Sequence, residues 1–438
     1  MRRVLLRTPR TPFDVVPRDR LLADGLIAGN AGNLVFLHAA YRLLATPGTQ
    51  ITPDRLGSRP EDADRINAEH DVYVVPFANA FRPQFRANLE RWTALISRLR
   101  IPVVILGVGA QSDLDYSLEP LADLDDLVRA FVTAVLDRGP SIGVRGEFTA
   151  RYLEHLGFRD VEVIGCPSVF VNGPNLSVEK RVAELGSDAR LAFNTAPSQA
   201  VAGPILDSLQ RRFPNLSYVA QDQASLELLL RGRIRRASTP PAGFPADAGH
   251  PLVQGHRLHV FPEPWPWFDF LRGQDFTFGS RAHGNLVSIA AGTPSYAFAH
   301  DSRTLELARY FDIPHRPLRQ VAPTLDPASL YEEADYGALN RGHAARWAAF
   351  EGYLRRHGLE HSFAAGGVEA FDERIAGLSF PIPGASNAAT GLPERLRGGI
   401  ARRVRRLRRG LRGNGSRRSL LREDQASSVD SQLDVAEG

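Results

Sequence analysis

An arginine and a histidine lie two residues apart in the stretch 275–285, Asp-Phe-Thr-Phe-Gly-Ser-Arg-Ala-His-Gly-Asn. The forked guanidinium of Arg281 suits a carboxylate or phosphate, and the imidazole of His283 can carry a proton near neutral pH. Glycines on both sides allow close backbone approach to a ligand. The pair therefore predicts a site for a small anion, although an Arg-x-His pair in a loop is also an ordinary solvated surface feature.

The elements around this pair give it a position. The pattern predicts a buried strand, a tight turn and a short helix that Gly292 and Pro294 end, so the pair falls at the carboxyl end of the strand. Ligands of open α/β sheets bind at that edge. The N–H groups at Gly284 and Asn285, in the first turn of the helix, would favour an anion.

Short apolar strands alternate with helices along the chain, which is typical of parallel sheets covered on both faces. A Gly-, Pro- and polar-rich stretch at 172–187 separates two such series. The predicted fold is α/β, with two Rossmann-like parallel-sheet domains. We expect an N-terminal domain, a C-terminal domain that carries Arg281, His283 and trailing helices, and a linker with a tail; their bounds are 1–178, 179–380 and 381–438.

The tail is rich in arginine, and apolar residues recur in it at helical spacing between residues 396 and 411. A basic amphipathic segment can lie on an anionic membrane surface. We therefore predict peripheral membrane contact through residues 392–422, with a solvated, disordered tail as the alternative. A nucleic-acid arm is the least favoured reading, because neither a reading motif nor interleaved aromatic residues accompany the arginines.

The composition excludes several classes of protein. The single cysteine, Cys166, rules out a disulfide framework and a cysteine-rich zinc site. The first residues are too few and too charged for a secretory signal, and no apolar run approaches the roughly 20 residues that span a bilayer. The net charge of +4 belongs to the tail. We predict a cytoplasmic protein, held at the inner face of the plasma membrane if the tail binds there.

Missing motifs narrow the chemistry further. Gly107-Val-Gly109 lacks the third glycine and the helix start of a dinucleotide fingerprint, and the chain contains no Walker-type Gly-Lys-Ser/Thr. NAD and ATP chemistry are therefore disfavoured. No closely spaced Asp/His/Glu cluster suggests a metal site, and no Gly-x-Ser-x-Gly nucleophile elbow occurs.

The stretch 275–285 resembles the polysaccharide pyruvyl transferase family. Supporting segments follow in the order expected for that family, at 29–33, 107–112, 143–147, 165–168, 292–294 and 301–303. Together they cover residues 22–311. Two positions depart from the family pattern: the usual leucine between the arginine and the histidine is Ala282, and the aspartate often found before the proline is Cys166.

The resemblance implies a fold like that of glycosyltransferase-B enzymes, in which the two domains face a cleft that holds the site. The N-terminal domain would then form the acceptor side, and the C-terminal domain would carry the donor site at Arg281 and His283. It also implies transfer of a pyruvyl group from phosphoenolpyruvate to a sugar of a cell-surface polysaccharide or its lipid-linked precursor, usually as a cyclic ketal. No metal or redox cofactor is required, and phosphoenolpyruvate is the co-substrate. The donor carries a carboxylate and a phosphate, its methylene must gain a proton, and a sugar hydroxyl must lose one.

The resemblance also suggests roles on the donor side. Arg281 would bind the phosphate or carboxylate with the N–H groups of Gly284 and Asn285. His283 would protonate the donor methylene or hold the departing phosphate. Two further arginines are expected as second anion contacts, with surface salt bridges as the equal alternative: Arg145 and Arg303.

Other residues are assigned to the acceptor and to proton removal. The side chains expected to hold sugar hydroxyls lie in glycine loops, where ordinary turn chemistry is the alternative: Asn30, Asn33 and Gln111. Asp301 could act as a base on the acceptor or could cap the helix that begins at Ser302. Trp265 and Trp267 could stack on a sugar, but packing within the second domain is the favoured use.

Two other functions remain open from the sequence. A nucleotide-sugar glycosyltransferase of similar fold would need acidic residues in the second domain to hold a ribose, and no convincing acidic pair follows Arg281. A non-catalytic scaffold of a glycan pathway would use only the arginine tail at the membrane and would tolerate loss of Arg281 and His283.

Overall fold

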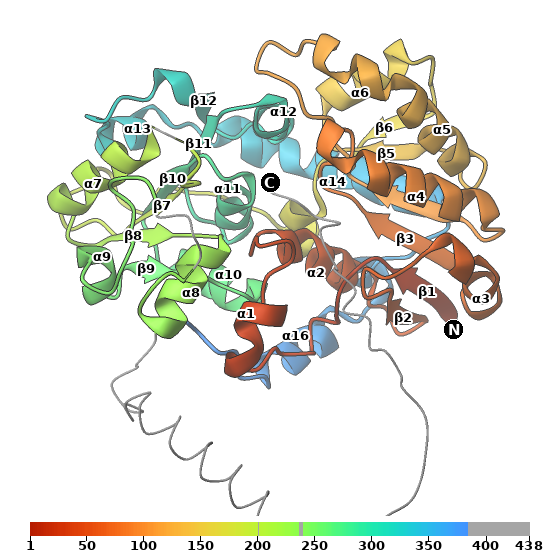
Figure 1. The fold of residues 1–438 in the computed structure, drawn as a ribbon, viewed down its shortest axis with the longest axis horizontal. Helices are drawn as coiled ribbons and strands as arrows, with labels where there is room; N and C mark the ends of the chain where they lie inside the picture. The colour runs from red at the N-terminus through yellow and green to blue at the C-terminus, as the bar shows by residue number, and fades with distance from the viewer. Residues whose placement is uncertain (200, 236–239, 384–438) are drawn as a thin grey trace, which may run out of the picture. The chain divides into compact units, whose positions relative to one another are not determined.

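The computed structural model describes residues 1–199, 201–235 and 240–383, and residues 1–383 pack as one compact unit (Figure 1). The unit contains two parallel sheets with helices around them. The segment predicted to contact a membrane, 392–422, lies outside the described residues.

The first sheet is parallel, with strand order β2-β1-β3-β4. A parallel bridge between Val108 and Val144 joins it to the small β5-β6 pair. The central strand β3 is a β-branched, fully buried run, as expected for a strand covered on both faces. The strands are β1 (Arg2–Leu6), β2 (Thr49–Pro53), β3 (Val72–Pro76), β4 (Val103–Leu106), β5 (Ile142–Val144) and β6 (Val161–Val163). The helices are α1 (Leu21–Asp24), α2 (Asn33–Leu44), α3 (Ala63–Glu69), α4 (Arg86–Arg98), α5 (Asp125–Leu136) and α6 (Glu147–His155).

The second sheet is also parallel, with strand order β12-β11-β10-β7-β8-β9. Its central strand β10 is the buried strand predicted before Arg281. The strands are β7 (Leu191–Asn194), β8 (Leu216–Val219), β9 (Leu258–His259), β10 (Phe276–Gly279), β11 (Ser295–Ala299) and β12 (His315–Pro317). The helices are α7 (Ala202–Arg212), α8 (Gln223–Arg231), α9 (Pro251–Gln254), α10 (Pro264–Arg272), α11 (Ala282–Ala290), α12 (Ser302–Tyr310) and α13 (Pro327–Glu333).

The last helices return to the first sheet: α14 (Gly337–Arg356), α15 (Ser362–Ala365) and α16 (Val368–Ala376). The Tyr353 hydroxyl on α14 donates to the carbonyl of Ile105 at 2.7 Å and accepts from the N–H of Gly143 at 3.1 Å. On α16, Asp372 pairs with Arg42 of α2 at 2.7 Å. These contacts place the trailing helices against the first half (Figure 1).

The predicted α/β class with two parallel-sheet halves is confirmed, while the division at residues 178 and 380 stays a prediction. Two edge strands were not predicted. The β2 sequence, Thr-Gln-Ile-Thr-Pro, is mostly polar and half-exposed, and β12, His-Arg-Pro, is three residues long. Such short polar edge strands carry little hydrophobic signal.

The carboxyl ends of the two sheets meet. After β4, the N–H of Ser112 donates to the Ser302 hydroxyl at 2.7 Å, and the N–H of Ser302 donates to the Ser112 carbonyl at 3.0 Å. Before α2, the N–H of Ala31 donates to the carbonyl of Gln221, which follows β8, at 2.8 Å. Loops from both halves therefore surround one region at the strand ends.

Candidate active site

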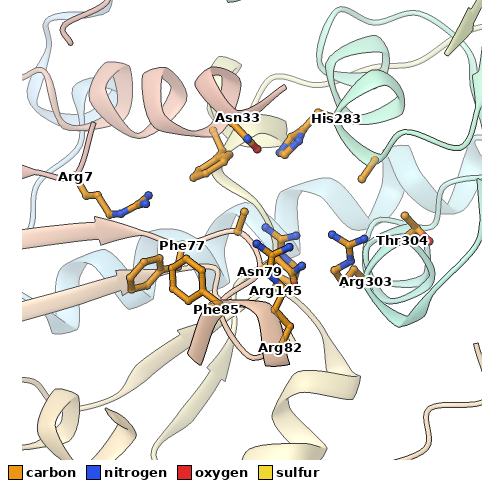
Figure 2. A pocket seen from close by; sticks show the side chains of 14 residues that line it. Arg7, Asn33, Phe77, Asn79, Arg82, Phe85, Arg145, His283, Arg303 and Thr304 are labelled. Atoms are coloured by element: carbon orange, nitrogen blue, oxygen red, sulfur yellow. The ribbon is translucent and has the colours of Figure 1, made fainter. Parts of the chain in front are cut away.

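A pocket lies at these strand ends and is lined by both halves (Figure 2). Among the described residues, its lining contains four arginines and a histidine but no aspartate or glutamate. Such a set favours an anionic ligand. The polar and charged lining residues are Arg7, Asn33, Asn79, Arg82, Arg145, His283, Arg303 and Thr304, and the apolar ones are Phe36, Phe77, Ala78, Ala80, Phe85 and Ala282.

His283 lies in the first turn of α11 and is 4% exposed. Its ring stacks on Phe36 of α2, with centroids 5.5 Å apart and planes 17° apart. Within the part of the chain that the structure describes, its Nε2 atom has no hydrogen-bond partner. Burial, together with the charges of Arg145, Arg303 and Arg281, lowers the pKa of His283 to about 3. The imidazole is therefore neutral near pH 7.

Gly32, the N-cap of α2, leaves the space that His283 occupies. A Cβ atom at residue 32 would lie 2.9 Å from His283 Cβ, 3.0 Å from His283 Nδ1 and 2.7 Å from Gln221 Oε1. Contacts this short force the neighbours to move. The predicted motif at 29–33 thus has a steric role beside its turn chemistry.

We expect Gly32→Ala to displace the His283 ring and lower kcat by about 10²-fold, since a shift of about 1 Å can cost that much. Gly57→Ala is the matched control, because a Cβ there would meet its nearest atoms at 3.7 Å. Steady-state rates and thermal unfolding of both variants check this prediction. Equal kcat in the two variants would contradict the steric argument.

Arg145 follows β5 and reaches the pocket past Gly109. A Cβ on Gly109 would lie 2.7 Å from Arg145 Cδ, so only glycine leaves room for the side chain. Arg145 Nε donates to the carbonyl of Gly107 at 3.3 Å. Burial lowers the pKa of the guanidinium. The Gly107-Val-Gly109 turn therefore admits an arginine to the site.

Arg303 is held by Asp301. The guanidinium donates to Asp301 Oδ2 from Nε at 2.8 Å and from NH2 at 2.5 Å. The other carboxylate oxygen, Oδ1, accepts from the N–H of Thr304 at 3.0 Å and caps α12. Burial opposes ionisation of Asp301, but Arg303 and the other nearby donors outweigh it and lower its pKa. The capping alternative is thus realised, while a role as base stays a prediction.

Asn79 and Arg82 were not identified from the sequence. Both follow β3, and the Asn79 amide lies between two guanidinium groups (Figure 2). With its oxygen turned toward them, Asn79 accepts from Arg303 NH1 at 3.0 Å and from Arg82 NH1 at 3.2 Å. The amide therefore links arginines from the two halves of the chain.

Glu306 supports this arginine group from behind. It lies one turn after Arg303 on α12 and is 1% exposed. Its Oε2 atom accepts from the N–H of Thr149 at 3.1 Å, and its Oε1 atom accepts from the Thr149 hydroxyl at 3.0 Å. Thr149 lies in the first turn of α6, directly after Arg145 and Gly146. Glu306 therefore fixes the helix that carries Arg303 against the turn that carries Arg145.

Burial raises the pKa of Glu306 to about 8 from 4.5, although Arg145 and Thr149 act in the opposite direction. Between these values the folded chain binds one more proton than the unfolded chain. This group therefore reduces the free energy of unfolding by about 1.4 kcal/mol for each pH unit gained, and the reduction is complete above pH 8.

Glu306→Gln should remove this dependence, so its stability relative to the parent should rise between pH 5.5 and 8. Denaturant unfolding at the two pH values measures the change. Glu227→Gln is the control, because Glu227 is also buried but hydrogen bonds from Arg235 and Arg231 outweigh burial and lower its pKa. A pH-independent stability difference for Glu306→Gln would contradict the assigned shift.

Arg281 does not line the pocket. It is the N-cap of α11, its N–H donates to Asn194 Oδ1 at 3.1 Å, and it is 8% exposed. The N–H of Asn285 is used within the helix by the Arg281 carbonyl at 3.2 Å, and the Asn285 side chain ties Gly279 to Ser295. Gly284 allows close packing, since a Cβ there would lie 2.5 Å from Asn194 Cγ. The donor roles of Arg281, Gly284 and Asn285 stay predictions.

Of the three predicted acceptor residues, Asn33 lines the pocket and the others do not. Asn33 Nδ2 donates to the carbonyl of Ile27 at 3.0 Å. Asn30 Oδ1 accepts from the N–H of Gly32 at 2.8 Å, as a turn residue does, and the Gln111 amide lies 2.9 Å from that of Asn79. Of the two predicted tryptophans, Trp267 stacks on Phe261 and Trp265 contacts Phe371, so both pack within the protein.

The geometry defines an α/β protein with an arginine-lined pocket at the facing strand ends. A family model described as polysaccharide pyruvyl transferase matches residues 30–302, and the chain belongs to this family. A search of curated proteins finds no match to the sequence.

Solved structures with a similar course of the chain include three sugar-related proteins. The first is a putative UDP-N-acetylglucosamine 2-epimerase from Listeria monocytogenes, with 10% identity over 87% of this chain and 98% of that chain and a TM-score of 0.39. The second is a UDP-GlcNAc 2-epimerase from Neisseria meningitidis bound to UDP-GlcNAc, with 10% identity over 86% of this chain and 99% of that chain and a TM-score of 0.38. The third is Anabaena Alr3699/HepE in complex with UDP and glucose, with 11% identity over 86% of this chain and 100% of that chain and a TM-score of 0.35.

In residues 1–199, 201–235 and 240–383, no helix is long and apolar enough to cross a bilayer. The same residues contain no group of three or more His, Cys, Asp or Glu side chains arranged to hold a metal ion.

Proposed function

We propose that the chain transfers the pyruvyl group of phosphoenolpyruvate to a sugar of a cell-surface polysaccharide or its lipid-linked precursor and forms a ketal. The observation that carries the proposal is that Arg82, Arg145 and Arg303 lie beside His283 in one pocket lined by both halves of the chain (Figure 2). Carboxylate and phosphate are the groups that arginine forks bind best. The pocket thus suits a small donor that carries both.

The reaction balances without a redox step. The bond between C2 of the donor and the phosphate oxygen breaks, and two sugar oxygens bond to C2. The donor methylene gains one proton and becomes a methyl group. The two sugar hydroxyls release two protons. One of them balances the proton that the methylene takes up, and the other leaves with the phosphate. The arginines would stabilise the charge on the departing phosphate.

His283 is the group available for proton transfer, because its Nε2 atom is buried and without a hydrogen-bond partner among the described residues. Because its pKa is lowered, His283 is neutral, not an imidazolium, before the donor binds. A bound donor with up to three negative charges would offset the arginine charges and raise the pKa of His283. The acid would therefore form only when the donor is bound.

Thermal unfolding with added ligands tests the proposal. Phosphoenolpyruvate should stabilise the chain, by about 2.7 kcal/mol at a hundredfold excess over its Kd, whereas UDP and UDP-sugars should not. Release of phosphate that requires a sugar acceptor would complete the assignment. Stabilisation by UDP alone, with no phosphate release, would sink the proposal and favour a nucleotide-sugar reaction.

A further inference from the structure

The side chain of Gln221, which follows β8, lies beside His283. A Cβ atom on Gly32 would lie 2.7 Å from Gln221 Oε1 and 3.0 Å from His283 Nδ1. Because both atoms lie within 3.0 Å of the same point, the amide oxygen and this ring nitrogen are neighbours across Gly32. The second half of the chain therefore places an uncharged hydrogen-bonding group next to its own histidine.

The turn that carries Gln221 is joined to the loop before α2. The Gln221 carbonyl accepts from the N–H of Ala31 at 2.8 Å, and Asn30 pairs with Asp222 in an antiparallel bridge. The Asp222 carboxylate caps α8 and accepts from the Ser225 N–H at 2.9 Å and from its hydroxyl at 3.0 Å. Both halves of the chain thus fix the position from which the Gln221 side chain starts, while the neighbouring carboxylate is used elsewhere.

The amide of Gln221 has hydrogen-bonding capacity left over. Gln221 is 1% exposed, and its Nε2 atom is buried without a hydrogen-bond partner among the described residues. Most buried polar groups of native proteins are hydrogen-bonded, because a buried donor without a partner costs stability. A role in the reaction explains a glutamine at this position better than packing does.

Protonated His283 needs an acceptor that neutral His283 does not need. A neutral imidazole carries one N–H group, whereas an imidazolium carries two. The charges that act on His283 are those of Arg145, Arg303 and Arg281, and a guanidinium cannot accept a hydrogen bond. The Gln221 oxygen lies on the Nδ1 side of the ring, so Nε2 is left for the ligand.

We propose that Gln221 is a positioning residue for His283: its Oε1 atom accepts the Nδ1–H of the imidazolium and directs Nε2–H at the donor methylene. The inference rests on the proposed pyruvyl transfer, in which His283 carries the proton. The Nε2–H bond breaks, its electrons return to the ring, and the proton forms the new C–H bond with the electron pair of the donor double bond. A sugar hydroxyl supplies the replacement proton, and the Nδ1–H stays in place throughout.

Steady-state kinetics of Gln221→Met test this role. Methionine fills a similar space but offers no amide oxygen, so kcat should fall by about 10- to 100-fold, the worth of one hydrogen bond to a charged group. The KM for phosphoenolpyruvate should rise by a smaller factor, because only part of the donor affinity depends on the proton of His283. In the double variant Gln221→Met/His283→Gln, kcat should equal that of His283→Gln, since the amide acts only through the imidazole.

Gln223→Met is the matched control. Gln223 opens α8 two residues further on, and its Nε2 atom donates to the carbonyl of Leu22 at 3.0 Å. It therefore also joins the two halves of the chain, but through a different contact. This variant should keep kcat within about twofold of the parent, and thermal unfolding of both methionine variants checks their fold.

Gln221→Glu tests the contact without any reaction. A carboxylate beside Nδ1 favours the imidazolium, so the proton affinity of His283 in the unliganded protein should rise at least about tenfold. NMR titration of the histidine ring protons measures this change, and the signal that disappears in His283→Gln identifies the residue. Gln223→Glu should leave the titration of His283 within about twofold of the parent.

Three results would overturn the inference. They are a parent-like kcat in Gln221→Met, a double variant that is slower than His283→Gln by the full factor lost in Gln221→Met, and an unchanged titration of His283 in Gln221→Glu. Failure of the proposed function looks different. In that case the parent releases no phosphate with any acceptor and the positioning role falls with it, while the effect of Gln221→Glu on the titration of His283 remains.

Discussion

Replacing His283 by glutamine is expected to lower the kcat of pyruvyl transfer by about 10²- to 10⁴-fold, the usual contribution of a positioned acid or base. Glutamine keeps a buried hydrogen-bonding group of similar size but cannot titrate. The imidazole of His283 is neutral near pH 7 in the unliganded protein and would gain its proton only when the donor is bound, so its loss also removes the part of the donor affinity that depends on that proton. The KM for phosphoenolpyruvate should therefore rise, but by a smaller factor than kcat falls.

The control is His259→Gln. Burial also lowers the pKa of His259, to about 4, but this residue stacks on Phe261 and does not line the pocket. Its variant should retain nearly full kcat. A His283→Gln enzyme that turns over within a few-fold of the parent would remove His283 from the proton transfer.

Proton uptake provides a second measurement on the same residue. Below pH 6.5 and above about 3, the unliganded site keeps His283 neutral. If the donor raises this pKa, binding must take up protons in that range, and affinity must fall as the pH rises through the raised value. Calorimetry in buffers of different ionisation enthalpy, with His283→Gln subtracted to remove the donor's own titration, gives the number of protons. No difference between the two proteins would contradict the coupling.

The sequence predicted the strand ends as the site because parallel strands place their carboxyl ends at one edge. It found Arg145, Arg303, His283 and Asn33, which the structure brings together in one pocket. Each follows a strand or opens a helix, and all but Arg303 do so within a glycine-containing motif. The local rules of turn and strand chemistry were sufficient for these residues.

Arg7, Asn79 and Arg82 escaped notice although each follows a buried strand, β1 or β3. The only sequence signal for these residues was their position at the carboxyl end of a strand, because no motif surrounds them. Arginines are common in this chain, and a lone arginine after a strand looks like a surface residue. What distinguishes these three is the pocket that they line together with residues of the other half, which is a tertiary property.

The role of Glu306 could not be predicted from the sequence, for a different reason. In the sequence it is an ordinary glutamate in an amphipathic helix, but the fold places it against Gly146 and Thr149 from the other half. A Cβ on Gly146 would lie 2.7 Å from Glu306 Oε2, so the glycine and the carboxylate fit together. Pairings between distant segments of this kind leave no periodic pattern in either segment.

Arg281 shows the reverse case. The motif predicted an anion-binding arginine, and the structure uses its backbone to start α11 while its side chain does not line the pocket. The neighbouring His283, two residues on, faces Phe36 and the pocket instead. Two residues of a helix turn point in different directions, so one member of an Arg-x-His pair can enter a site without the other.

Replacing Arg145 by alanine should raise the KM for phosphoenolpyruvate by about 30- to 1000-fold, the range for truncating one partner of a buried charged contact. The guanidinium is buried and enters the pocket past Gly109, so the donor replaces the water that the group has lost. Arg145→Lys keeps the charge but not the fork, and should lie between the parent and the alanine variant. Steady-state kinetics and thermal shifts with phosphoenolpyruvate measure both.

The Arg145→Ala substitution should affect the stability of the fold much less than it affects the affinity for phosphoenolpyruvate. Burial lowers the pKa of Arg145, which means that the folded protein bears the cost of keeping this cation out of water. Removing it also removes one of the charges that lower the pKa of His283. We therefore expect Arg145→Ala to unfold at a temperature close to that of the parent while donor binding is lost.

The control is Arg190→Ala. The Arg190 side chain is 57% exposed and pairs with Asp275 at the opposite end of β7. If Arg145→Ala left the KM unchanged, or if its loss of affinity matched that of Arg190→Ala, the donor would have to bind elsewhere in the pocket.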